Sequence, residues 1–158
     1  NLAACSLDEH QYKKLNFILN ESAILENAKQ KVEKFDIRPT DPKIRVSTMS
    51  GGNMQKVVVA REVSLAQKFL LASQPTRGID IGAIEAIRNI LQDAKAKGVG
   101  VLLISTELEE VLSLSDRIIV LYEGKVAGIM NAEEANEDNL GILMLGGKLE
   151  DTAKGGSH

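Results

Sequence analysis

A small, glycine-bearing turn formed by Ser50, Gly51 and Gly52 is the part of the sequence best suited to chemistry. We call it the Ser-Gly-Gly turn, and a helix is expected to begin directly after it. Glycines let backbone N–H groups approach a ligand closely, Ser50 adds a hydroxyl, and a helix N-terminus carries partial positive charge. Phosphate is therefore the ligand that this turn favours, although an ordinary helix cap explains the same three residues taken alone.

Three further polar residues follow apolar runs that predict strands. Ser73 and Gln74 come directly after residues 69–72, and Thr106 follows residues 100–105. Ligands of open α/β sheets bind outside the carboxyl ends of the strands. We therefore expect chemistry at the turns after Ala72 and Ser105. The alternative for Ser73 and Gln74 is that they simply cap a helix or fill a turn.

The elements that position these residues alternate between short apolar runs and helices from residue 69 onward. A helix over about residues 82–97, with Gly98 as its stop, separates the first two runs. Runs that are apolar on both faces predict an α/β fold with a mostly parallel sheet flanked by helices. The predicted strands are residues 69–72, 100–105, 117–121 and 125–130. The predicted inner stripe of the helix is Ile84, Ile87, Leu91 and Ala94.

Two helices are predicted before the first of these strands. The chain reads as helical to about Phe35, with Asn20 or Ser22 as the cap, and a polar loop over residues 36–42 ends this part. The second helix runs from the Ser-Gly-Gly turn to about residue 66. We expect one face of this helix to carry Val58, Ala60, Val63 and Ala66.

Composition narrows the classes of function. The chain has 158 residues, which suits one domain, and its net charge of −3 provides no basic patch for nucleic acid. No apolar run approaches the roughly 18–20 residues that cross a bilayer, so we expect any membrane link to run through a partner. One cysteine, Cys5, allows no internal disulfide, and we expect no metal site at His10 or His158. The tail, residues 155–158, resembles a vector-encoded linker.

Four segments in order closely resemble the ATPases of ABC transporters. Residues 47–56 resemble the signature helix, residues 69–80 the Walker B strand and D-loop, residues 101–111 the switch turn, and residues 116–125 the closing hairpin. The amino-acid sequences of residues 74–80, 82–87 and 139–147 are most similar to those of the second, C-terminal ATP-binding half of importers for simple sugars and nucleosides.

This resemblance implies a partial ABC-ATPase domain of the P-loop NTPase-like class. Residues 1–46 would form a segment of the helical subdomain. Residues 47–147 would form the signature helix and the Walker B, D-loop and switch portion of the core, and residues 148–158 a tail. No Gly-x-x-x-x-Gly-Lys-Ser/Thr occurs in the sequence, so we expect the chain to begin after the P-loop and the glutamine-bearing Q-loop.

The resemblance also exposes departures from the family pattern. Ser73 and Gln74 occupy the positions of an aspartate that helps to hold magnesium and a glutamate that polarises the attacking water. Thr106 occupies the position of the switch histidine. A hydroxyl is a poor magnesium anchor, and losing a general base typically costs about 10² to 10⁴ in rate. The resemblance therefore implies a degenerate hydrolytic site.

The Ser-Gly-Gly turn keeps the family pattern and implies a role at another domain's site. In ABC ATPases each nucleotide lies between the P-loop of one domain and the signature motif of its partner. Ser50, Gly51, Gly52 and Gln55 would then contact the γ-phosphate of ATP held by a companion half, and Asp80 would communicate across the interface. An ordinary helix N-cap is the alternative for Asp80.

The same resemblance implies partners and a location. The full-length protein would use ATP and Mg²⁺, with no tightly bound nucleotide on this chain alone. Its partners would be a companion ATPase half, membrane permease subunits and, indirectly, a substrate-binding protein, at the cytoplasmic face of the membrane. We expect the chain itself to self-associate through exposed sheet edges or apolar surface.

Two alternatives remain open at this stage. One is a non-catalytic docking module whose helical segment to Phe35 binds permease loops. The other is a chromosome-maintenance ATPase, which is disfavoured because no heptad pattern adjoins the signature motif.

Overall fold

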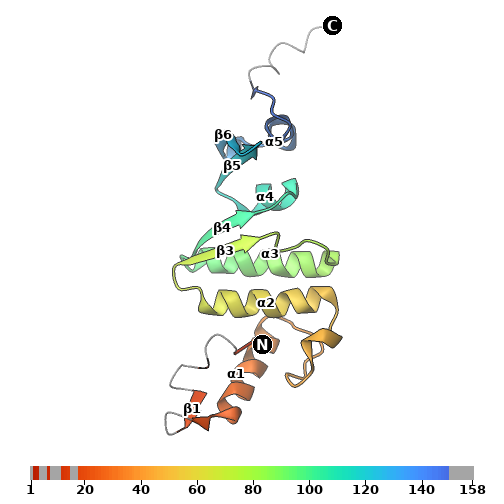
Figure 1. Ribbon diagram of the computed structural model, residues 1–158, viewed down its shortest axis with the longest axis vertical. Helices are drawn as coiled ribbons and strands as arrows, with labels where there is room; N and C mark the ends of the chain where they lie inside the picture. Colours follow the sequence, from red (N-terminus) through yellow and green to blue (C-terminus); the bar gives the residue numbers. More distant parts are fainter. Residues whose placement is uncertain (1, 4–6, 8–11, 15–17, 150–158) are drawn as a thin grey trace. The chain divides into compact units, whose positions relative to one another are not determined.

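Strands and helices alternate from Phe69 onward as predicted (Figure 1), which confirms the α/β class. The elements of this part are β3 (Phe69–Ser73), α3 (Ile81–Ala96), β4 (Gly100–Ile104), α4 (Leu108–Leu114), β5 (Arg117–Tyr122), β6 (Lys125–Asn131), the 3-10 helix η3 (Ala132–Glu134) and α5 (Glu137–Met144). All four predicted strands are present, and their observed ends lie within one residue of the predicted ones.

The structure is a computed structural model that describes residues 2–3, 7, 12–14 and 18–149. Cys5, His10, His158 and the tail that we assigned to a linker lie outside the described residues. The chain divides into two compact units, Asn1–Ile104 and Ser105–His158. Each unit is described by itself.

The first unit begins with elements that the sequence only partly predicts. Helix α1 (Glu21–Lys34) is confirmed, and its cap is Asn20, whose Oδ1 accepts the N–H of Ala23 at 3.4 Å. The helical interpretation of everything before Phe35 is wrong for β1 (Lys13–Lys14) and β2 (Ile18–Leu19), which pair in antiparallel fashion. A 3-10 helix, η2 (Val46–Thr48), and the helix α2 (Gly51–Leu65) follow.

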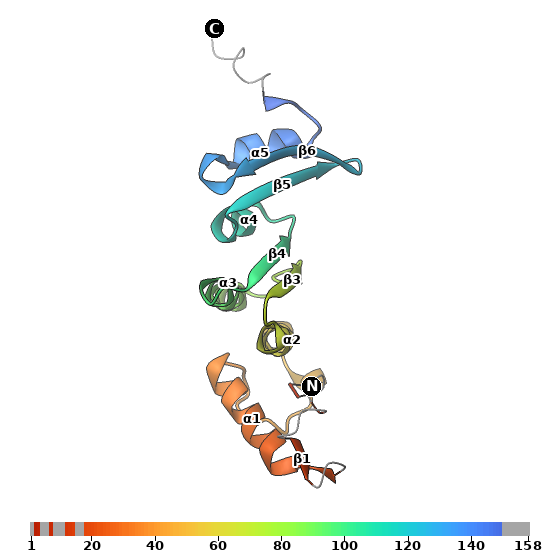
Figure 2. The ribbon, with the colours of Figure 1, turned by 90° about the vertical axis from the view of Figure 1, so that its left-hand side faces the viewer.

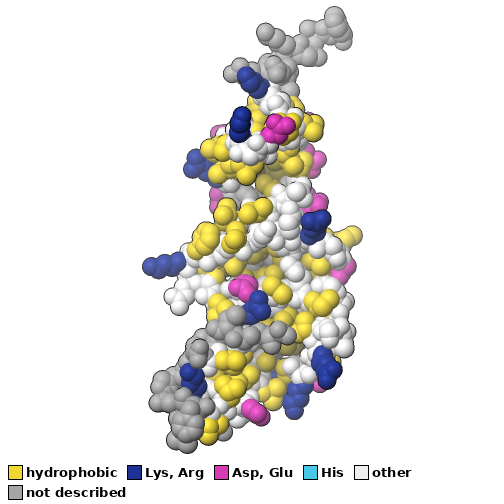
Figure 3. Space-filling view, in the orientation of Figure 1, with side chains coloured by type: hydrophobic (Ala, Val, Ile, Leu, Met, Phe, Trp, Pro, Cys, Tyr) yellow, Lys and Arg dark blue, Asp and Glu magenta, His cyan; other side chains and the backbone are white. Residues whose placement is uncertain are grey.

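β3 and β4 form a parallel pair in register from Phe69 with Gly100 to Ser73 with Ile104 (Figure 2). The other strand pairs among the described residues are antiparallel, so parallel pairing is confirmed for β3 and β4 alone. Alternation along β3 buries Leu70 and Ala72, whereas Phe69 and Leu71 are 62% and 56% exposed. Hydrophobic side chains accordingly gather at the surface over these strands (Figure 3).

Helix α3 follows its predicted signals closely. Asp80 is the N-cap, and Gly98 has a positive φ of 84°, which is the conformation that a glycine after a helix end adopts most easily. The buried stripe is Ala83, Ile87, Leu91 and Ala94, which confirms three of the four predicted residues. The fourth, Ile84, is half-buried, and Ala83 is the buried residue at that end of the stripe. Helices α2 and α3 contact each other.

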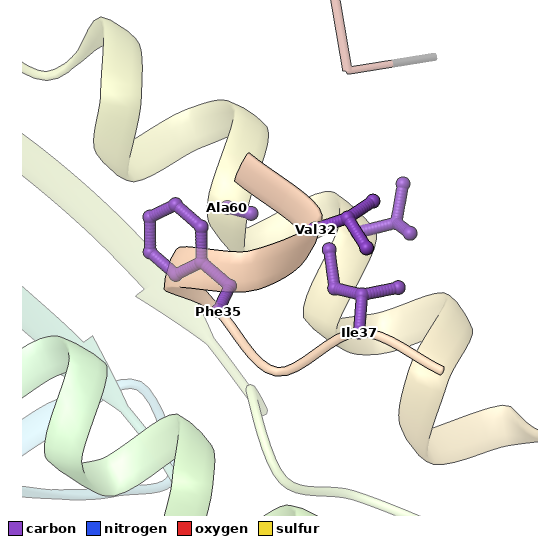
Figure 4. Packing of buried hydrophobic residues seen from close by; sticks show 5 residues of the cluster. Val32, Phe35, Ile37 and Ala60 are labelled. Carbon is purple, nitrogen blue, oxygen red and sulfur yellow. The ribbon is translucent and has the colours of Figure 1, made fainter. Parts of the chain in front are cut away.

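The face of α2 that packs inward includes the predicted Ala60 but not the predicted Val58. Val57 and Ala60 of α2 join Val32, Phe35 and Ile37 in a buried cluster (Figure 4), while Val58 is 41% exposed. Val58 lies about 100° around the helix from Val57, which turns it away from this cluster. The prediction failed because α2 packs against elements on more than one side, as its further buried residues Gly52 and Val59 indicate.

The second unit contains an antiparallel hairpin and two helices. β5 and β6 pair through the turn at Glu123 and Gly124, with a register shift between Val120 and Leu121. Helix α5 packs on this hairpin, and α4 packs on α5. The buried core of the unit consists of Ile118, Val120, Leu140 and Leu143.

Candidate functional site

The Ser-Gly-Gly turn forms the start of α2. Ser50 is the N-cap, and its Oγ accepts the backbone N–H of Asn53 at 3.4 Å. Ser50 and Gly51 are exposed, and a methyl group added at Gly51 would meet nothing within 4 Å. The first N–H groups of a helix must find partners outside it. A hydroxyl, helical N–H groups and open space therefore coincide here, as an anionic ligand requires.

Gly52 is the point where α2 approaches the start of α3. A Cβ at Gly52 would lie 2.6 Å from the Cβ of Ala83 and 2.7 Å from Oδ2 of Asp80, so no side chain fits without a shift. The other oxygen of Asp80, Oδ1, accepts the N–H of Ala83 at 2.9 Å. The N-cap role of Asp80 is thus confirmed, and its role across an interface stays a prediction. The carboxylate nevertheless lies directly beside the Ser-Gly-Gly turn.

Gln55 connects α2 to the turn after β3. Its side-chain Nε2 donates to the carbonyl oxygen of Pro75 at 2.9 Å. We predicted that Gln55 contacts phosphate, and that prediction stays untested. In this structure its amide holds the Pro75 turn against α2. This hydrogen bond adds to the close packing of Gly52 beside Asp80.

Ser73 and Gln74 lie at the carboxyl end of β3, as predicted. Ser73 is the last residue of the strand and is exposed. Gln74 has a positive φ of 49°, and its backbone N–H donates to the carbonyl oxygen of Ile104 at 2.7 Å. Its backbone therefore fills a tight turn, which agrees with the interpretation of Gln74 as a turn residue, and its role in a degenerate site stays a prediction.

Thr106 belongs to the second unit, where it is exposed and precedes α4. The neighbouring Ser105 accepts the N–H of Glu107 through its Oγ at 3.1 Å. Thr106 is therefore presented on a short turn between β4 and α4, at the position where the sequence predicted a strand end.

Within the described ranges, no group of three or more His, Cys, Asp or Glu side chains is arranged to hold a metal ion. Across the same described ranges, no helix has both the length and the apolar character needed to span a bilayer.

Asn53 is the residue of the site that the sequence prediction missed. Its Oδ1 accepts the backbone N–H of Arg38 at 2.7 Å, and its Nδ2 donates to Oγ of Ser50 at 3.0 Å. The available signal was a polar residue three positions after an N-cap serine, which is where a side chain can reach back to the cap. That signal identifies the contact with Ser50, but the contact with Arg38 depends on the tertiary fold.

Asp36 holds together the loop that contributes Arg38. The Nε of Arg38 bonds to Oδ1 of Asp36 at 3.0 Å, and this hydrogen bond, followed by the charges of Arg38 and Lys56, lowers the pKa of Asp36 below its ordinary value. The Nζ of Lys56, a largely buried α2 residue, donates to the carbonyl oxygen of Asp36 at 2.9 Å. The loop after α1 is thus attached to the helix that carries the Ser-Gly-Gly turn.

Comparison with curated proteins finds ATP-binding proteins of importers. The chain is 43% identical over 133 residues to the nucleoside import ATP-binding protein NupA of Lactococcus lactis subsp. cremoris, with 84% of the chain and 26% of that protein covered. It is 38% identical over 137 residues to the guanosine import ATP-binding protein NupO of Bacillus subtilis, with coverage of 87% and 27%. A ribose import ATP-binding protein, RbsA of Lactococcus lactis subsp. cremoris, is 42% identical over 120 residues, with coverage of 76% and 24%. The chain thus spans about a quarter of the length of these relatives.

Solved structures agree with the sequence relatives. An ATP-binding cassette of an ABC transporter matches with a TM-score of 0.67 and 26% identity, over 85% of this chain and 53% of that one. An ATP-binding subunit of an ABC transporter matches in fold with a TM-score of 0.63 and 21% identity, over 82% of this chain and 57% of that one. No protein-family model matches the chain. The chain is therefore homologous to one segment of the ATP-binding proteins of ABC-type sugar and nucleoside importers.

Proposed function

We propose that this chain is the signature-bearing segment of the second ATP-binding half of an importer for a simple sugar or nucleoside. In this proposal the Ser-Gly-Gly turn contacts the γ-phosphate of ATP held by a companion ATPase half. The observation that carries the proposal is the exposed Ser50 and Gly51 at the start of α2, with open space in front of them. The relatives NupA, NupO and RbsA, which are nucleoside, guanosine and ribose import ATP-binding proteins, support the same class of parent protein.

The chemistry of the turn is that of an anion site. The hydroxyl of Ser50 and the first N–H groups of α2 donate to phosphate oxygens, and the helix N-terminus adds favourable partial charge. Asp80 caps α3 and lies so close to Gly52 that no side chain fits between them. A companion domain that reaches Asp80 would therefore also influence the Ser-Gly-Gly turn.

We further propose that the chain's own hydrolytic site is degenerate. Mg²⁺ prefers anionic oxygen ligands, and Ser73 offers a neutral hydroxyl at the end of β3. Gln74 can hold water by a hydrogen bond but cannot accept its proton, and Thr106 lacks an imidazole. ATP and Mg²⁺ would accordingly belong to the full-length protein, with hydrolysis supported by the turn acting on the companion's nucleotide.

The proposal assigns partners and a location to the full-length protein. The partners are a companion ATPase half, permease subunits in the membrane and, through them, a substrate-binding protein. The location is the cytoplasmic face of the membrane, with the protein bound there through the permease.

Substitutions in the Ser-Gly-Gly turn test the proposal in the full-length importer complex. Gly51→Glu places a carboxylate in the open space where phosphate would bind, whereas Gly51→Ala fills the same space without charge and is the matched control. Ser50→Ala removes one hydrogen bond to a charged group, which is worth about 1.5–3 kcal/mol, or roughly 10- to 150-fold in rate. We expect ATP turnover to fall by that factor in Ser50→Ala, to fall further in Gly51→Glu, and to change little in Gly51→Ala.

The same measurement separates the docking module from the proposed function. If α1 binds permease loops and nucleotide does not contact this chain, turnover and transport will persist in both Ser50→Ala and Gly51→Glu. Unchanged turnover in these two variants would overturn the proposed contact with ATP.

A further inference from the structure

Asn53 bridges the loop after α1 to the hydroxyl of Ser50. Its Oδ1 accepts from the backbone N–H of Arg38 at 2.7 Å, and its Nδ2 donates to Oγ of Ser50 at 3.0 Å. We infer that Asn53 is a positioning residue that sets the Ser50 hydroxyl as a donor toward the nucleotide, under the control of the loop after α1. This inference rests on the proposed function of the Ser-Gly-Gly turn.

The backbone N–H of Arg38 determines the orientation of the Asn53 amide. A backbone N–H can only donate, so the atom that faces it must be the amide oxygen. The amide nitrogen is then left to face Ser50, and a nitrogen with two hydrogens can only donate to Oγ. The Arg38 N–H therefore determines that the Asn53 amide presents a donor, and not an acceptor, to Oγ of Ser50.

The consequence for Ser50 is a defined direction for its own proton. Oγ accepts from Nδ2 of Asn53 at 3.0 Å and, more weakly, from the Asn53 backbone N–H at 3.4 Å. Both acceptor positions of the hydroxyl are then occupied, and its hydrogen is directed away from Asn53 toward the exposed side of the turn. A phosphate oxygen that approaches this side of the turn can accept the Ser50 hydrogen.

The loop that carries Arg38 is firmly attached to α2. Ile37, the residue before Arg38, is fully buried in the cluster with Val57 and Ala60 of α2 (Figure 4). Nζ of Lys56 bonds to the carbonyl oxygen of Asp36 at 2.9 Å and lies 3.5 Å from its Oδ2. The Arg38 N–H is thus held at a fixed place relative to Ser50. A movement of the loop that broke these contacts would release the Asn53 amide and with it the direction of the Ser50 hydroxyl.

Two variants of Asn53 and one control separate its two contacts. Asn53→Ala removes both of them. Asn53→Asp keeps an acceptor for the Arg38 N–H but replaces the donor to Ser50 with a carboxylate that draws the Ser50 proton to itself. Asn139→Asp is the matched control. Asn139 is the third residue of α5, as Asn53 is of α2, and its backbone N–H donates to Oδ1 of the α5 cap residue, Asn136, at 2.8 Å.

The first readout is amide hydrogen exchange of Arg38, measured by NMR on this chain. We expect protection in the wild type and in Asn53→Asp, and faster exchange by about 3- to 10-fold in Asn53→Ala, as the loss of one ordinary hydrogen bond implies. An Arg38 amide whose exchange is the same in Asn53→Ala as in the wild type would overturn the bridge.

The second readout is ATP turnover in the full-length importer complex. We expect Asn53→Ala to lose about 3- to 10-fold in kcat, Asn53→Asp to lose more than Asn53→Ala, and Asn139→Asp to match the wild type. In a Ser50→Ala background, Asn53→Ala should cost nothing further, because its effect passes through the missing hydroxyl.

The outcomes distinguish this inference from the function on which it rests. If Ser50→Ala loses turnover while Asn53→Asp and Asn53→Ala retain it, the Ser-Gly-Gly turn contacts nucleotide and the positioning role of Asn53 is wrong. Equal losses from Asn53→Ala with and without Ser50 would also overturn the positioning role. If Ser50→Ala itself leaves turnover unchanged, the proposed function fails and the inference with it.

Discussion

The close approach of Gly52 to α3 predicts opposite effects for alanine at two adjacent glycines. A Cβ at Gly52 would lie 2.6 Å from the Cβ of Ala83 and 2.7 Å from Oδ2 of Asp80, whereas a Cβ at Gly51 meets nothing within 4 Å. Neither obstacle moves easily, since Ala83 Cβ is fixed to the backbone of α3 and Asp80 is held by its bond to the Ala83 N–H at 2.9 Å.

The magnitude follows from two terms. Replacing glycine by alanine within a helix stabilises it by about 0.5–1 kcal/mol, and this gain applies to both positions. Overpacking a close contact costs about 1–3 kcal/mol and applies to Gly52 alone. The helical term cancels when the two variants are compared. We therefore expect the free energy of unfolding of Gly51→Ala to exceed that of Gly52→Ala by about 1–3 kcal/mol.

This difference in the free energy of unfolding can be measured on the 158-residue chain by urea denaturation, monitored by circular dichroism. A double variant, Gly52→Ala with Ala83→Gly, removes one of the two obstructing groups. Its cost should be smaller than the sum of the two separate costs, because the substitutions meet at one contact. Equal stability of Gly51→Ala and Gly52→Ala would refute the close packing of α2 on α3.

Three further predictions use other contacts of the first unit. Gln55→Leu removes the hydrogen bond to the Pro75 carbonyl and should lower the free energy of unfolding by about 0.5–1.5 kcal/mol in urea denaturation, and an unchanged midpoint would contradict the bond. Because the folded-state pKa of Asp36 lies below its ordinary value of 3.8, its carboxylate stabilises the fold above that pH and loses this effect as the pH falls through the lowered pKa. Asp36→Asn should therefore be less stable than the wild type near neutral pH, with a gap that closes in acid, and a gap that is constant with pH would refute this. The exposed apolar face of β3 should make the chain self-associate, so light scattering should detect a dimer or larger species. Leu71→Lys should reduce the fraction of this species, whereas a monomeric wild type would contradict the prediction.

Local signals in the sequence were sufficient for the elements whose ends carry caps and stops. Asp80 marks the start of α3 because its side-chain oxygen satisfies one of the first N–H groups. Gly98 marks its end because a glycine easily adopts the positive φ that follows the last turn. The apolar runs at residues 69–72 and 100–105, with a helix between them, correctly predicted a parallel pair, since a helix is the usual crossover connection between parallel strands.

Tertiary packing decided the features that were missed. Val58 follows the apolar spacing of α2 but is exposed, because the neighbours of the helix, and not its own periodicity, select the buried face. The short strands β1 and β2 carry no alternating pattern long enough to distinguish them from a helix.

In the candidate site, too, local sequence signals predicted some features and tertiary packing determined the others. The Ser-Gly-Gly turn was found from its residue types, since a serine cap and glycines at a helix start have a local chemical meaning. The bond from Arg38 to Asn53 spans 15 positions and the bond from Gln55 to Pro75 spans 20, so no local pattern indicates either one. Sequence therefore identified the groups that face a ligand, whereas the structure was needed to identify the groups that hold them.

A photoreactive ATP analogue with its reactive group on the γ-phosphate tests the central claim most directly. Cross-linked to the full-length importer complex and located by peptide mass spectrometry, the label should appear on the peptide that contains Ser50 and Gly51, and Gly51→Glu should abolish that label while Gly51→Ala retains it. Labelling of the complex that leaves this peptide unmodified in the wild type would contradict the proposed contact between the Ser-Gly-Gly turn and the nucleotide.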